Sequence, residues 1–583
     1  MFSRRSRARV HEIAPDEIFL DSTNLPGVDS SQFEGRLERP VSRSSIVGVS
    51  VVFALIAVVF CARAFDLQVA RGASFASISR DNTLESWPLF AQRGLIRDRT
   101  GAELAWNEAQ TDAGSMGSPQ ATSTLTAQAA TTTPYALRRY TTEPGLSVLL
   151  GFLRYPRRDQ SGTWWRDVYT GMSGIELSFD EQLSGVNGST MIETDAHHHI
   201  VQQNIETPPE NGADLTLSID ADVQTHLFQI LSAHAREQHF VGGAAIIMDV
   251  HTGELLAITS FPEYSNQAFT DGDIAAVRDA SNSLATPLLD RAISGLYAPG
   301  SIVKPIFAAA ALNEGVISPD KQILSTGAIT IPNPYDPAHP SVFRDWTVHG
   351  WVDMRTALAV SSDEYFYTVG GGYGGQPGLG IGRIDAYAAR FGLGTTTGIA
   401  LLGEKGGNIP SIAWKAQAFP EDPTWRLGDT YHTVIGQYGF QVTPIQAVRY
   451  IAAIANGGDL LTPQLIASST PHFTALGIPD AHLEVVREGM RLGVTSGRSD
   501  AIEKFFNMQS IQISGKTGTA QIGTHNQWIN SWAVGFWPAD HPRFAYAVVL
   551  EHAPASTLSG AAPGLLPFFQ WLVSAHPEYV NPN

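Results

Sequence analysis

Residues 298–315 read APGSIVKPIFAAAALNEG, and this stretch decides the fold of the larger part of the chain. Its Pro-Gly pair predicts a turn, and the apolar run after it predicts a helix from about Ser301 to Gly315. Ser301 and Lys304 are three residues apart, so on that helix they share a face and should touch. Serine needs a base within reach to become a good nucleophile. A lysine serves as that base when burial or a neighbouring cation lowers its pKa. Alone the spacing is weak, because Ser-x-x-Lys also occurs on surface helices.

A second candidate element is Ser361-Ser362-Asp363. A hydroxyl at Ser361 could pass a proton between the lysine and a leaving amine. Taken alone, the triplet also fits an ordinary helix cap or turn.

A third element, Lys516-Thr517-Gly518-Thr519, falls on a predicted strand. Gly518 would let a ligand approach the backbone closely. The lysine and the two threonine hydroxyls suit a substrate carboxylate. The backbone N–H groups of Thr519 and Ser301 could together form an oxyanion hole. An exposed strand with a bulge at the glycine is the plain alternative, and the three elements in order along one chain favour a catalytic site.

Apolar strands at both ends of residues 241–583 predict one sheet. GGAAIIMDVHTGELLAITSF (242–261) is typical of a hairpin, and IQISGKTGTAQI (511–522), SWAVGFWPA (531–539) and FAYAVVLEH (544–552) predict three antiparallel strands. Between them, MRTALAVSSDEYFYTV (354–369) and VTPIQAVRYIAAIANGG (442–458) have helical patterns. We therefore predict an α+β domain, an antiparallel sheet flanked by helices.

Residues 44–62, SSIVGVSVVFALIAVVFCA, are uncharged and close to the roughly 20 residues that cross a membrane as a helix. The preceding arginines predict that the N-terminus stays in the cytoplasm and that the chain after Arg63 lies outside. We expect a cytoplasmic tail over 1–43, a transmembrane helix over 44–63 and a β-rich segment over 64–240. A cleaved signal peptide ending near Ala62-Arg63-Ala64 and a buried core helix are the less favoured interpretations.

Charge and cysteine content narrow the classes of ligand. The formal net charge is -18, which argues against nucleic acid as a partner. Cys61 is the sole cysteine, so neither an intrachain disulfide nor a CxxC metal site can form. His197, His198 and His199 are adjacent, and neighbouring residues on a strand point to opposite faces, so they should not converge on a metal.

At these residues the chain resembles the class B penicillin-binding proteins, the transpeptidases of peptidoglycan synthesis. RAISGLYAPGSIVKP (291–305) and SGKTGTAQ (514–521) are similar to the family's catalytic signatures. Four further segments resemble its non-catalytic pedestal: FDLQVARG (65–72), RGLIRDRTGAELA (93–105), GMSGIELSFDEQLSG (171–185) and ETDAHHH (193–199). FRDW (343–346) and SSDEYFY (361–367) look like the elongation branch, penicillin-binding protein 2.

The resemblance implies roles for these residues. Ser301 would attack the penultimate D-Ala carbonyl of a stem peptide, with Lys304 as general base and Ser361 as proton shuttle. Lys516, Thr517 and Thr519 would hold the carboxylate and the oxyanion. The expected partners are stem peptides ending in D-Ala-D-Ala, β-lactams, the cytoplasmic membrane, a SEDS-type glycan polymerase and other elongation-complex proteins. No cofactor is expected.

Two positions depart from the family pattern. Asp363 stands where the wider family has Asn, and an ionised carboxylate cannot donate to a substrate amide; it is expected to pair with Lys304 or Lys516 instead. Some elongation-type members bind zinc near the RDW segment. Here Asp345 and His349 are present, but Ser362 replaces the cysteine and serine is a poor zinc ligand, so we predict no zinc.

Two other functions share these residues. A β-lactam sensor or β-lactamase would also use the serine and lysine, and a scaffold that activates a glycan polymerase would use the pedestal. The long segment before the catalytic motifs and the N-terminal anchor argue against the first function, and the intact motifs argue against a dead enzyme.

Overall fold

The structure is a computed structural model of the 583-residue chain. It describes residues 42–74, 83–108, 134–160, 162–194, 200–333, 336–467, 470–496 and 502–580. Nearly all of the predicted cytoplasmic tail and the run His197–His199 therefore lie outside the described residues. The described chain divides into two compact units, residues 1–86 with 191–204 and residues 87–190 with 205–583.

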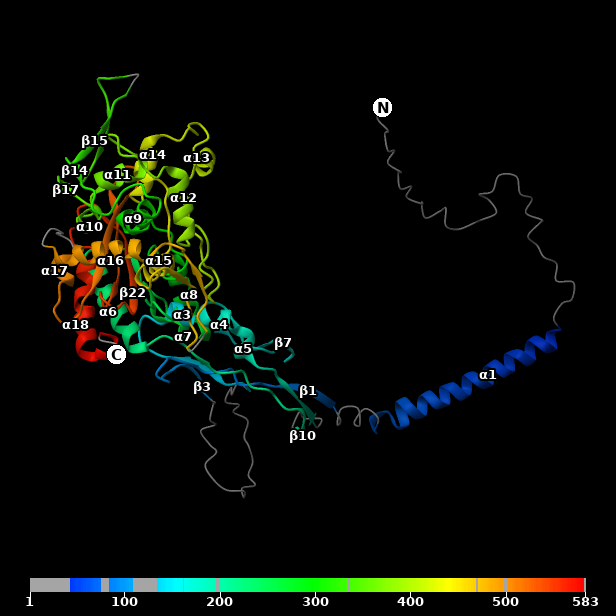
Figure 1. Ribbon diagram of the computed structural model, residues 1–583. Helices are drawn as coiled ribbons and strands as arrows, with labels where there is room; N and C mark the ends of the chain where they lie inside the picture. The colour runs from blue at the N-terminus through cyan, green and yellow to red at the C-terminus, as the bar shows by residue number, and fades with distance from the viewer. Residues whose placement is uncertain are drawn as a thin grey trace, which may run out of the picture. The chain divides into compact units, whose positions relative to one another are not determined.

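The first unit contains the apolar helix α1, Arg43–Phe65, which runs on as one π-helical segment, η3, Asp66–Ala70. Ser42 begins the helix by accepting a hydrogen bond from the Ser45 N–H. No side chain of α1 is buried, and within the described residues it is the one helix long and apolar enough to span a membrane (Figure 1). The predicted apolar helix is confirmed.

Short strands follow the anchor. β1 (Thr83–Leu89), β9 (Gly188–Thr194) and β10 (Ile200–Thr207) form one sheet in the order β1-β9-β10. A second sheet has the order β11-β2-β3-β4, with strands Leu215–Thr216, Ile96–Arg97, Glu103–Glu108 and Leu137–Tyr140. Two small pairs complete this β-rich region: β5 (Leu153–Arg154) with β8 (Thr170–Gly171), and β6 (Arg157–Arg158) with β7 (Trp164–Arg166).

A buried ion cluster holds the second sheet to the short helices beside it, α3 (Ser147–Leu150), α4 (Gly174–Ser178) and α5 (Asp180–Ser184). Glu176 Oε2 accepts from Arg93 Nε at 2.6 Å and Oε1 accepts from Arg138 Nε at 2.8 Å, and none of the three side chains is exposed. Buried charges are tolerated because each has an opposite charge and further hydrogen bonds. Removing Glu176 would leave the buried Arg138 without its counter-ion and Arg93 with Asp180, 2.7 Å away, as its remaining one.

The third predicted motif lies on a five-stranded antiparallel sheet of order β13-β12-β22-β21-β20. Its strands are β12 (Gly242–Asp249), β13 (Leu255–Phe261), β20 (Ser514–Ile522), β21 (Trp528–Trp537) and β22 (Phe544–Pro554). Strands from the beginning and the end of the domain therefore pair, as β12 does with β22. The predicted hairpin and the predicted C-terminal strands are present, and the edge strand β20 carries Lys516–Thr519.

Helices cover both faces of this sheet (Figure 1). On one face pack α6 (Ala221–Glu237) and α18 (Ala561–Ala575), and on the other α9 (Lys304–Asn313) and α15 (Pro444–Ala455). Side chains of β12 alternate between the two apolar cores: Ala244 and Ile246 face α9 and α15, and Ala245 and Ile247 face α6 and α18. The predicted α+β architecture is confirmed.

The remaining elements lie around these layers and between the sheet and the β-rich region. They are α7 (Asn266–Asp271), α8 (Ile274–Asn282), β14 (Ile323–Ser325), β15 (Ala328–Ile331), β16 (Ser341–Arg344), β17 (Gly350–Val352), α10 (Met354–Ala359), α11 (Asp363–Gly371), α12 (Ile381–Arg390), α13 (Ile412–Ala418), α14 (Leu427–Val434), β18 (Asp459–Leu461), β19 (Phe473–Ala475), α16 (Asp480–Thr495) and α17 (Glu503–Phe506), with the turn η5 (Pro577–Tyr579) near the C-terminus. The helical pattern of 354–369 forms two helices, because Ser361 leaves helical geometry with φ +57°.

Candidate active site

Ser301 lies in a short 3-10 turn, η4, Gly300–Val303, which leads directly into α9. The turn is held by segments far away in the sequence. The Gly300 N–H donates to the Gly436 carbonyl at 3.0 Å, and the Tyr450 hydroxyl donates to the Ile302 carbonyl at 2.7 Å. The position of the serine is thus fixed by backbone hydrogen bonds and not by its own side chain.

The edge strand β20 lies against this turn. A methyl group built on Gly518 would come 2.8 Å from the Pro299 carbonyl oxygen, a distance that a real side chain does not reach without a shift of the backbone. On the neighbouring strand, the Trp532 indole N–H donates to the Ala298 carbonyl at 3.0 Å. Gly518 is therefore required for the strand to approach the segment that carries Ser301, whereas the sequence led us to expect it to admit a ligand.

The Lys304 amine is fully buried and points to the second motif. Its Nζ donates to Asp363 Oδ1 at 2.6 Å, to the Ser361 carbonyl at 2.7 Å and to Ser361 Oγ at 3.3 Å. Across the described part of the chain, no hydrogen bond joins Lys304 to Ser301 Oγ. Of the two pairings expected for Asp363, the structure contains the one with Lys304.

Lys516 reaches the same hydroxyl from the opposite side. Its Nζ donates to Ser361 Oγ at 2.8 Å and to the Thr517 carbonyl at 2.9 Å, and only 4% of the residue is exposed. Burial lowers the pKa of Lys516 well below the usual lysine value, and repulsion from Lys304 adds to the effect, while the Asp363 charge opposes it. One hydroxyl thus lies within hydrogen-bond reach of both amines.

Ser361 has a left-handed backbone, φ +57°, which costs a serine on the order of 1 kcal/mol. The residues beside it are fixed from outside the motif. The Trp346 indole N–H donates to the Val360 carbonyl at 3.2 Å, and Ser362 Oγ donates to Asp345 Oδ2 at 2.8 Å. The break between α10 and α11 therefore presents the Ser361 hydroxyl to both amines.

Asp345, His349 and Ser362, the residues weighed above as zinc ligands, lie next to one another. His349 Nε2 lies 3.5 Å from Asp345 Oδ1, longer than a normal hydrogen bond. Burial alone would raise the pKa of Asp345, but His349, the Glu364 N–H, Lys304 and Ser362 lower it to about 2.

This group does not fit a zinc ion. The Ser362 hydroxyl already donates to the carboxylate, and a neutral hydroxyl is a poor zinc ligand. Within the described ranges, no group of three or more His, Cys, Asp and Glu side chains could hold a metal. Asp345 instead caps α11 by accepting from the Glu364 N–H at 2.9 Å.

The structure brings all three motifs around Ser301, with Thr517, Gly518 and Thr519 along β20 beside the serine turn. Sequence reasoning missed the residues that hold the motifs in place. Glu364 is one: its carboxylate accepts from the backbone N–H groups of Thr326 and Gly327, both at 2.7 Å. In the sequence, only the acidic character of Glu364 and its place next to Asp363 could have suggested this role. Its partners lie almost forty residues earlier, so no local pattern connects them to it.

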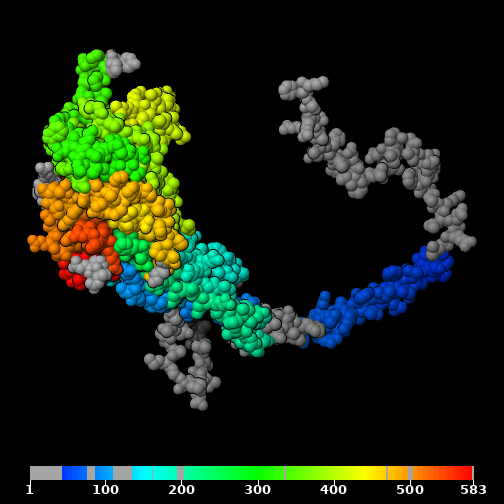
Figure 2. Space-filling model, in the orientation of Figure 1, coloured from blue at the N-terminus to red at the C-terminus, as the bar shows by residue number. Residues whose placement is uncertain are grey.

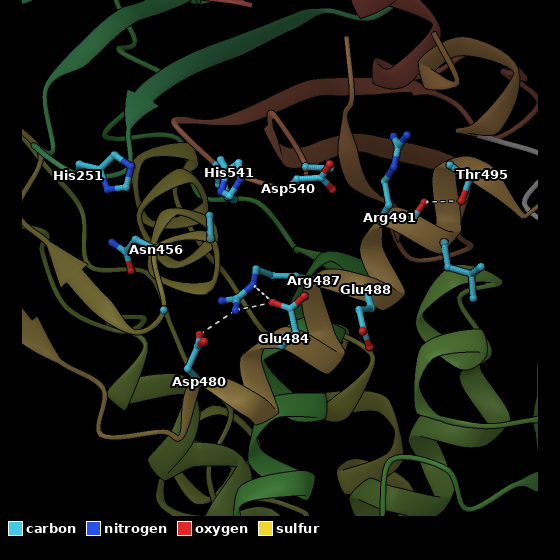
Figure 3. Close-up of a pocket in the computed structure, with 15 residues that line it drawn as sticks. His251, Asn456, Asp480, Glu484, Arg487, Glu488, Arg491, Thr495, Asp540 and His541 are labelled. Carbon is cyan, nitrogen blue, oxygen red and sulfur yellow. Dashed lines mark hydrogen bonds and ion pairs between the residues drawn. The ribbon is translucent and has the colours of Figure 1, made fainter. Parts of the chain in front are cut away.

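A pocket of about 870 Å³ lies elsewhere, between α16, the end of α15 and the turn that joins β21 to β22 (Figure 3). None of the predicted site residues lines it. Its charges largely satisfy one another: Arg487 binds both Asp480 and Glu484, at 2.7 and 2.6 Å. The residues predicted for catalysis therefore lie beside β20 and not in this pocket.

Comparison with known proteins agrees with this geometry. The penicillin binding protein transpeptidase domain matches residues 243–568, and the penicillin-binding protein dimerisation domain matches residues 122–217. The peptidoglycan D,D-transpeptidase MrdA of Haemophilus influenzae is 30% identical over 466 residues, which cover 74% of this chain and 68% of the relative. Other relatives of the same name are also 30% identical, and the chain spans 63% of their length.

Solved structures show the same fold. Pseudomonas aeruginosa PBP2, in complex with WCK 5153, is 28% identical, with a TM-score of 0.66 over 86% of this chain and all of that one. PBP2 of Helicobacter pylori, in complex with MreC, gives 0.67 at 23% identity over 85% of this chain and 100% of that one. The chain therefore belongs to the penicillin-binding proteins, in the elongation-type branch of the peptidoglycan D,D-transpeptidases.

Proposed function

We propose that this protein cross-links peptidoglycan stem peptides through an acyl-enzyme on Ser301, in cell elongation, and that β-lactams acylate the same serine. The observation that carries the proposal is the Ser361 hydroxyl, which lies 3.3 Å from the Lys304 amine and 2.8 Å from the Lys516 amine, beside the turn that holds Ser301. A serine, two buried amines and a bridging hydroxyl form a proton relay.

The reaction would proceed in two halves. Ser301 Oγ bonds to the carbonyl carbon of the penultimate D-Ala and gives its proton to Lys304. The bond to the terminal D-Ala then breaks, and that amine takes a proton through Ser361 and leaves. An amine from a neighbouring stem then bonds to the acyl carbon and gives up a proton, and the bond from that carbon to Ser301 Oγ breaks. The cross-link is thereby made, and the proton passes to Ser301 Oγ and regenerates its hydroxyl.

Proton transfer can use both amines. Lys304 accepts the Ser301 proton only when its own nitrogen is neutral. Burial and the Lys304 charge lower the pKa of Lys516, so Lys516 is the amine able to take a proton passed along Ser361. Asp363, 2.6 Å from Lys304 Nζ, would hold that nitrogen in line with the relay.

The edge strand β20 would bind the end of the donor peptide. The Lys516 amine supplies N–H donors near the carboxylate, and Thr517 and Thr519 supply hydroxyls. The backbone N–H groups of Ser301 and Thr519 would stabilise the oxyanion. A methyl group on Gly300 would lie 3.2 Å from the Thr519 carbonyl, and this close approach of the two segments supports that role.

Cellular placement follows from the anchor. We propose that α1 spans the cytoplasmic membrane with the N-terminus inside and the catalytic residues outside, as the arginines before it predict. Segments 64–240 and 241–583 would act as pedestal and transpeptidase domain. A SEDS-type glycan polymerase and a partner similar to MreC are the expected elongation-complex proteins, the latter because a related PBP2 is known in complex with MreC.

The deciding experiment is labelling of the full chain and of Ser301→Ala with a fluorescent penicillin, followed by mass spectrometry of the adduct. We expect a long-lived adduct on the peptide that contains Ser301 and none in the variant. Steady nitrocefin turnover would instead identify a β-lactamase. A Ser301→Ala variant that still supports cell shape would identify a scaffold.

A further inference from the structure

The β6–β7 hairpin of the pedestal concentrates positive charge in a chain whose net charge is -18. Arg157 pairs with Arg166 across the two strands, and Arg158 pairs with Trp164. Arg154 lies on the preceding strand β5. We call Arg154, Arg157, Arg158 and Arg166, together with Trp164 and Trp165, the arginine hairpin; β7 is labelled in Figure 1, and Figure 2 shows in cyan the surface formed by this part of the sequence.

These arginines are not neutralised by the protein. In the portion of the chain that the structure describes, none of the four forms an ion pair within 4.0 Å, whereas Arg93, Arg139 and Arg291 each bind a carboxylate. Burial lowers the pKa of Arg166, and repulsion from Arg154 and Arg157 lowers it further. The buried Nε of Arg166 has no hydrogen-bond partner. Positive charges that lie close together without a counter-ion indicate that an anionic ligand binds here.

Aromatic rings hold the guanidinium groups in place. Arg158 lies between two indoles, 4.8 Å from the ring centre of Trp87 and 4.3 Å from that of Trp164. Arg166 lies 4.6 Å above Trp165, whose side chain is 58% exposed. Trp164 packs against Phe90 at 4.8 Å. A stacked guanidinium keeps its planar N–H edge free for a bidentate carboxylate, and it loses little entropy on binding.

We propose that the arginine hairpin binds the glycan strand of peptidoglycan through its stem-peptide carboxylates, at a site separate from Ser301. This rests on the proposed function, because the strand is the polymer that Ser301 would cross-link. Such a polymer carries carboxylates at regular intervals, and they match a row of arginine forks. Its sugar rings have apolar faces, which match the exposed indole of Trp165. Holding the strand here would raise the concentration of further stem peptides available to Ser301.

The test is co-sedimentation of the full-length protein, in detergent, with purified insoluble peptidoglycan. The variants are Arg157→Glu and Trp165→Ala. The control is Arg278→Glu, whose exposed side chain contacts only the adjacent Asp279. We expect Arg157→Glu to weaken binding about tenfold and Trp165→Ala to weaken it several-fold, and the control to bind as wild type does. Added salt and enzymatic removal of the stem peptides should weaken wild-type binding.

Three results would overturn the proposal. One is equal sedimentation of all variants. Another is undiminished binding of peptidoglycan stripped of its peptides. The third is that the hairpin variants lose binding to phosphatidylglycerol vesicles but still bind peptidoglycan. That result would show that the hairpin binds anionic lipid. Penicillin labelling of Ser301 should be unchanged in every variant, which shows that each one folds. A different pair of results would be no penicillin labelling of wild type together with reduced binding of the hairpin variants to peptidoglycan. That pair of results would contradict the proposed function and would still support the arginine hairpin as a peptidoglycan-binding site.

Discussion

Ser361 links the two amines of the site, and its own backbone is strained. Replacement by Ala removes the bridging hydroxyl and keeps the strain, and replacement by Gly removes both. We expect either variant to be acylated by penicillin about a hundredfold more slowly. Ser361→Gly should nevertheless be more stable than Ser361→Ala by about 1 kcal/mol, because glycine adopts φ +57° without strain.

Acylation kinetics and urea unfolding of the two variants test this pair of expectations. An acylation rate near that of wild type in either variant would remove Ser361 from the relay. Equal unfolding free energies would show that the left-handed backbone carries no strain.

The shifted pKa of Lys516 gives acylation a pH dependence with a definite sign. Acid protonates this amine and blocks the relay, so the rate should fall as the pH drops through the lowered pKa. The Asp363 charge raises that pKa, so Asp363→Asn should lower it further and move the acid limb to lower pH, with a smaller maximum rate.

Stopped-flow acylation from about pH 6 to about pH 9 measures the limb. Lys516→Arg is the matched control, since arginine stays charged and should show no limb over that range. An acid limb that moved to higher pH in Asp363→Asn would contradict the assignment. The lowered pKa of Lys516 also makes the free energy of unfolding depend on pH. Because folded Lys516 binds its proton more weakly than unfolded lysine, the folded state should become more stable as the pH rises toward the ordinary lysine pKa of 10.5.

Sequence spacing identified the residues of the site but not all of their contacts. The three-residue spacing predicted contact between Lys304 and Ser301, and a 3-10 turn with tertiary contacts directs the lysine to Asp363 and Ser361 instead. The positive φ of Ser361 depends on Trp346 and Asp345, about fifteen residues earlier. No local pattern in one sequence contains that information.

At the scale of elements, helix α16 connects the 870 Å³ pocket to the catalytic strand. Arg491, in the pocket wall (Figure 3), donates through Nη1 to the Ile513 carbonyl at 2.7 Å, one residue before β20 begins. We expect Arg491→Ala to slow penicillin acylation several-fold and to lower stability by about 1 kcal/mol, because the start of the strand loses an anchor.

Arg491→Lys should recover part of the rate, and Thr495→Ala is the control in the same pocket wall, since the Thr495 hydroxyl bonds only to the Arg491 carbonyl. The readouts are the acylation rate and the thermal midpoint. Equal effects of Arg491→Ala and Thr495→Ala would mean that α16 supports the fold alone and does not position β20.

Long elements were predictable and short ones were not. The strands of the central sheet and α15 have extended apolar patterns that reveal them. The pairs β14 with β17 and β15 with β16 consist of three or four residues each, too few for a period to show. The helix expected over 354–369 ends at Ala359 and resumes at Asp363, because local propensity yields there to tertiary contacts.

At the scale of the whole molecule, the anchor should be separable from catalysis. Helix α1 has no buried residue, so deleting residues 1–63 should remove no core packing that involves this helix. We expect the full chain in the membrane fraction, resistant to high salt, and the truncated chain in the soluble fraction with unchanged penicillin labelling. A truncated protein that lost the label would show that the segment before Ala64 contributes to the fold.

The family resemblance covered most of the chain, and composition alone would not have revealed it. The acidic net charge argued against nucleic acid as a partner, and the single cysteine excluded an intrachain disulfide. Neither observation indicated a reaction. The boundaries at residues 43, 63 and 240 stay predictions, since the matching domains cover 122–217 and 243–568. The arginine hairpin had no signal in the sequence analysis, because unpaired charge becomes visible only when neighbours are known.

The glycines around the nucleophile limit how this protein can evolve drug resistance. A side chain on Gly436 would meet the Gly300 carbonyl oxygen at 2.2 Å, and one on Gly518 would meet the Pro299 carbonyl at 2.8 Å. Because backbone packs directly against backbone at both glycines, neither position can accept a larger residue. Resistance through a side chain that blocks the antibiotic but not the natural peptide is therefore excluded at these two positions. Escape mutations should therefore arise at exposed positions, where a side chain can change without displacing the serine.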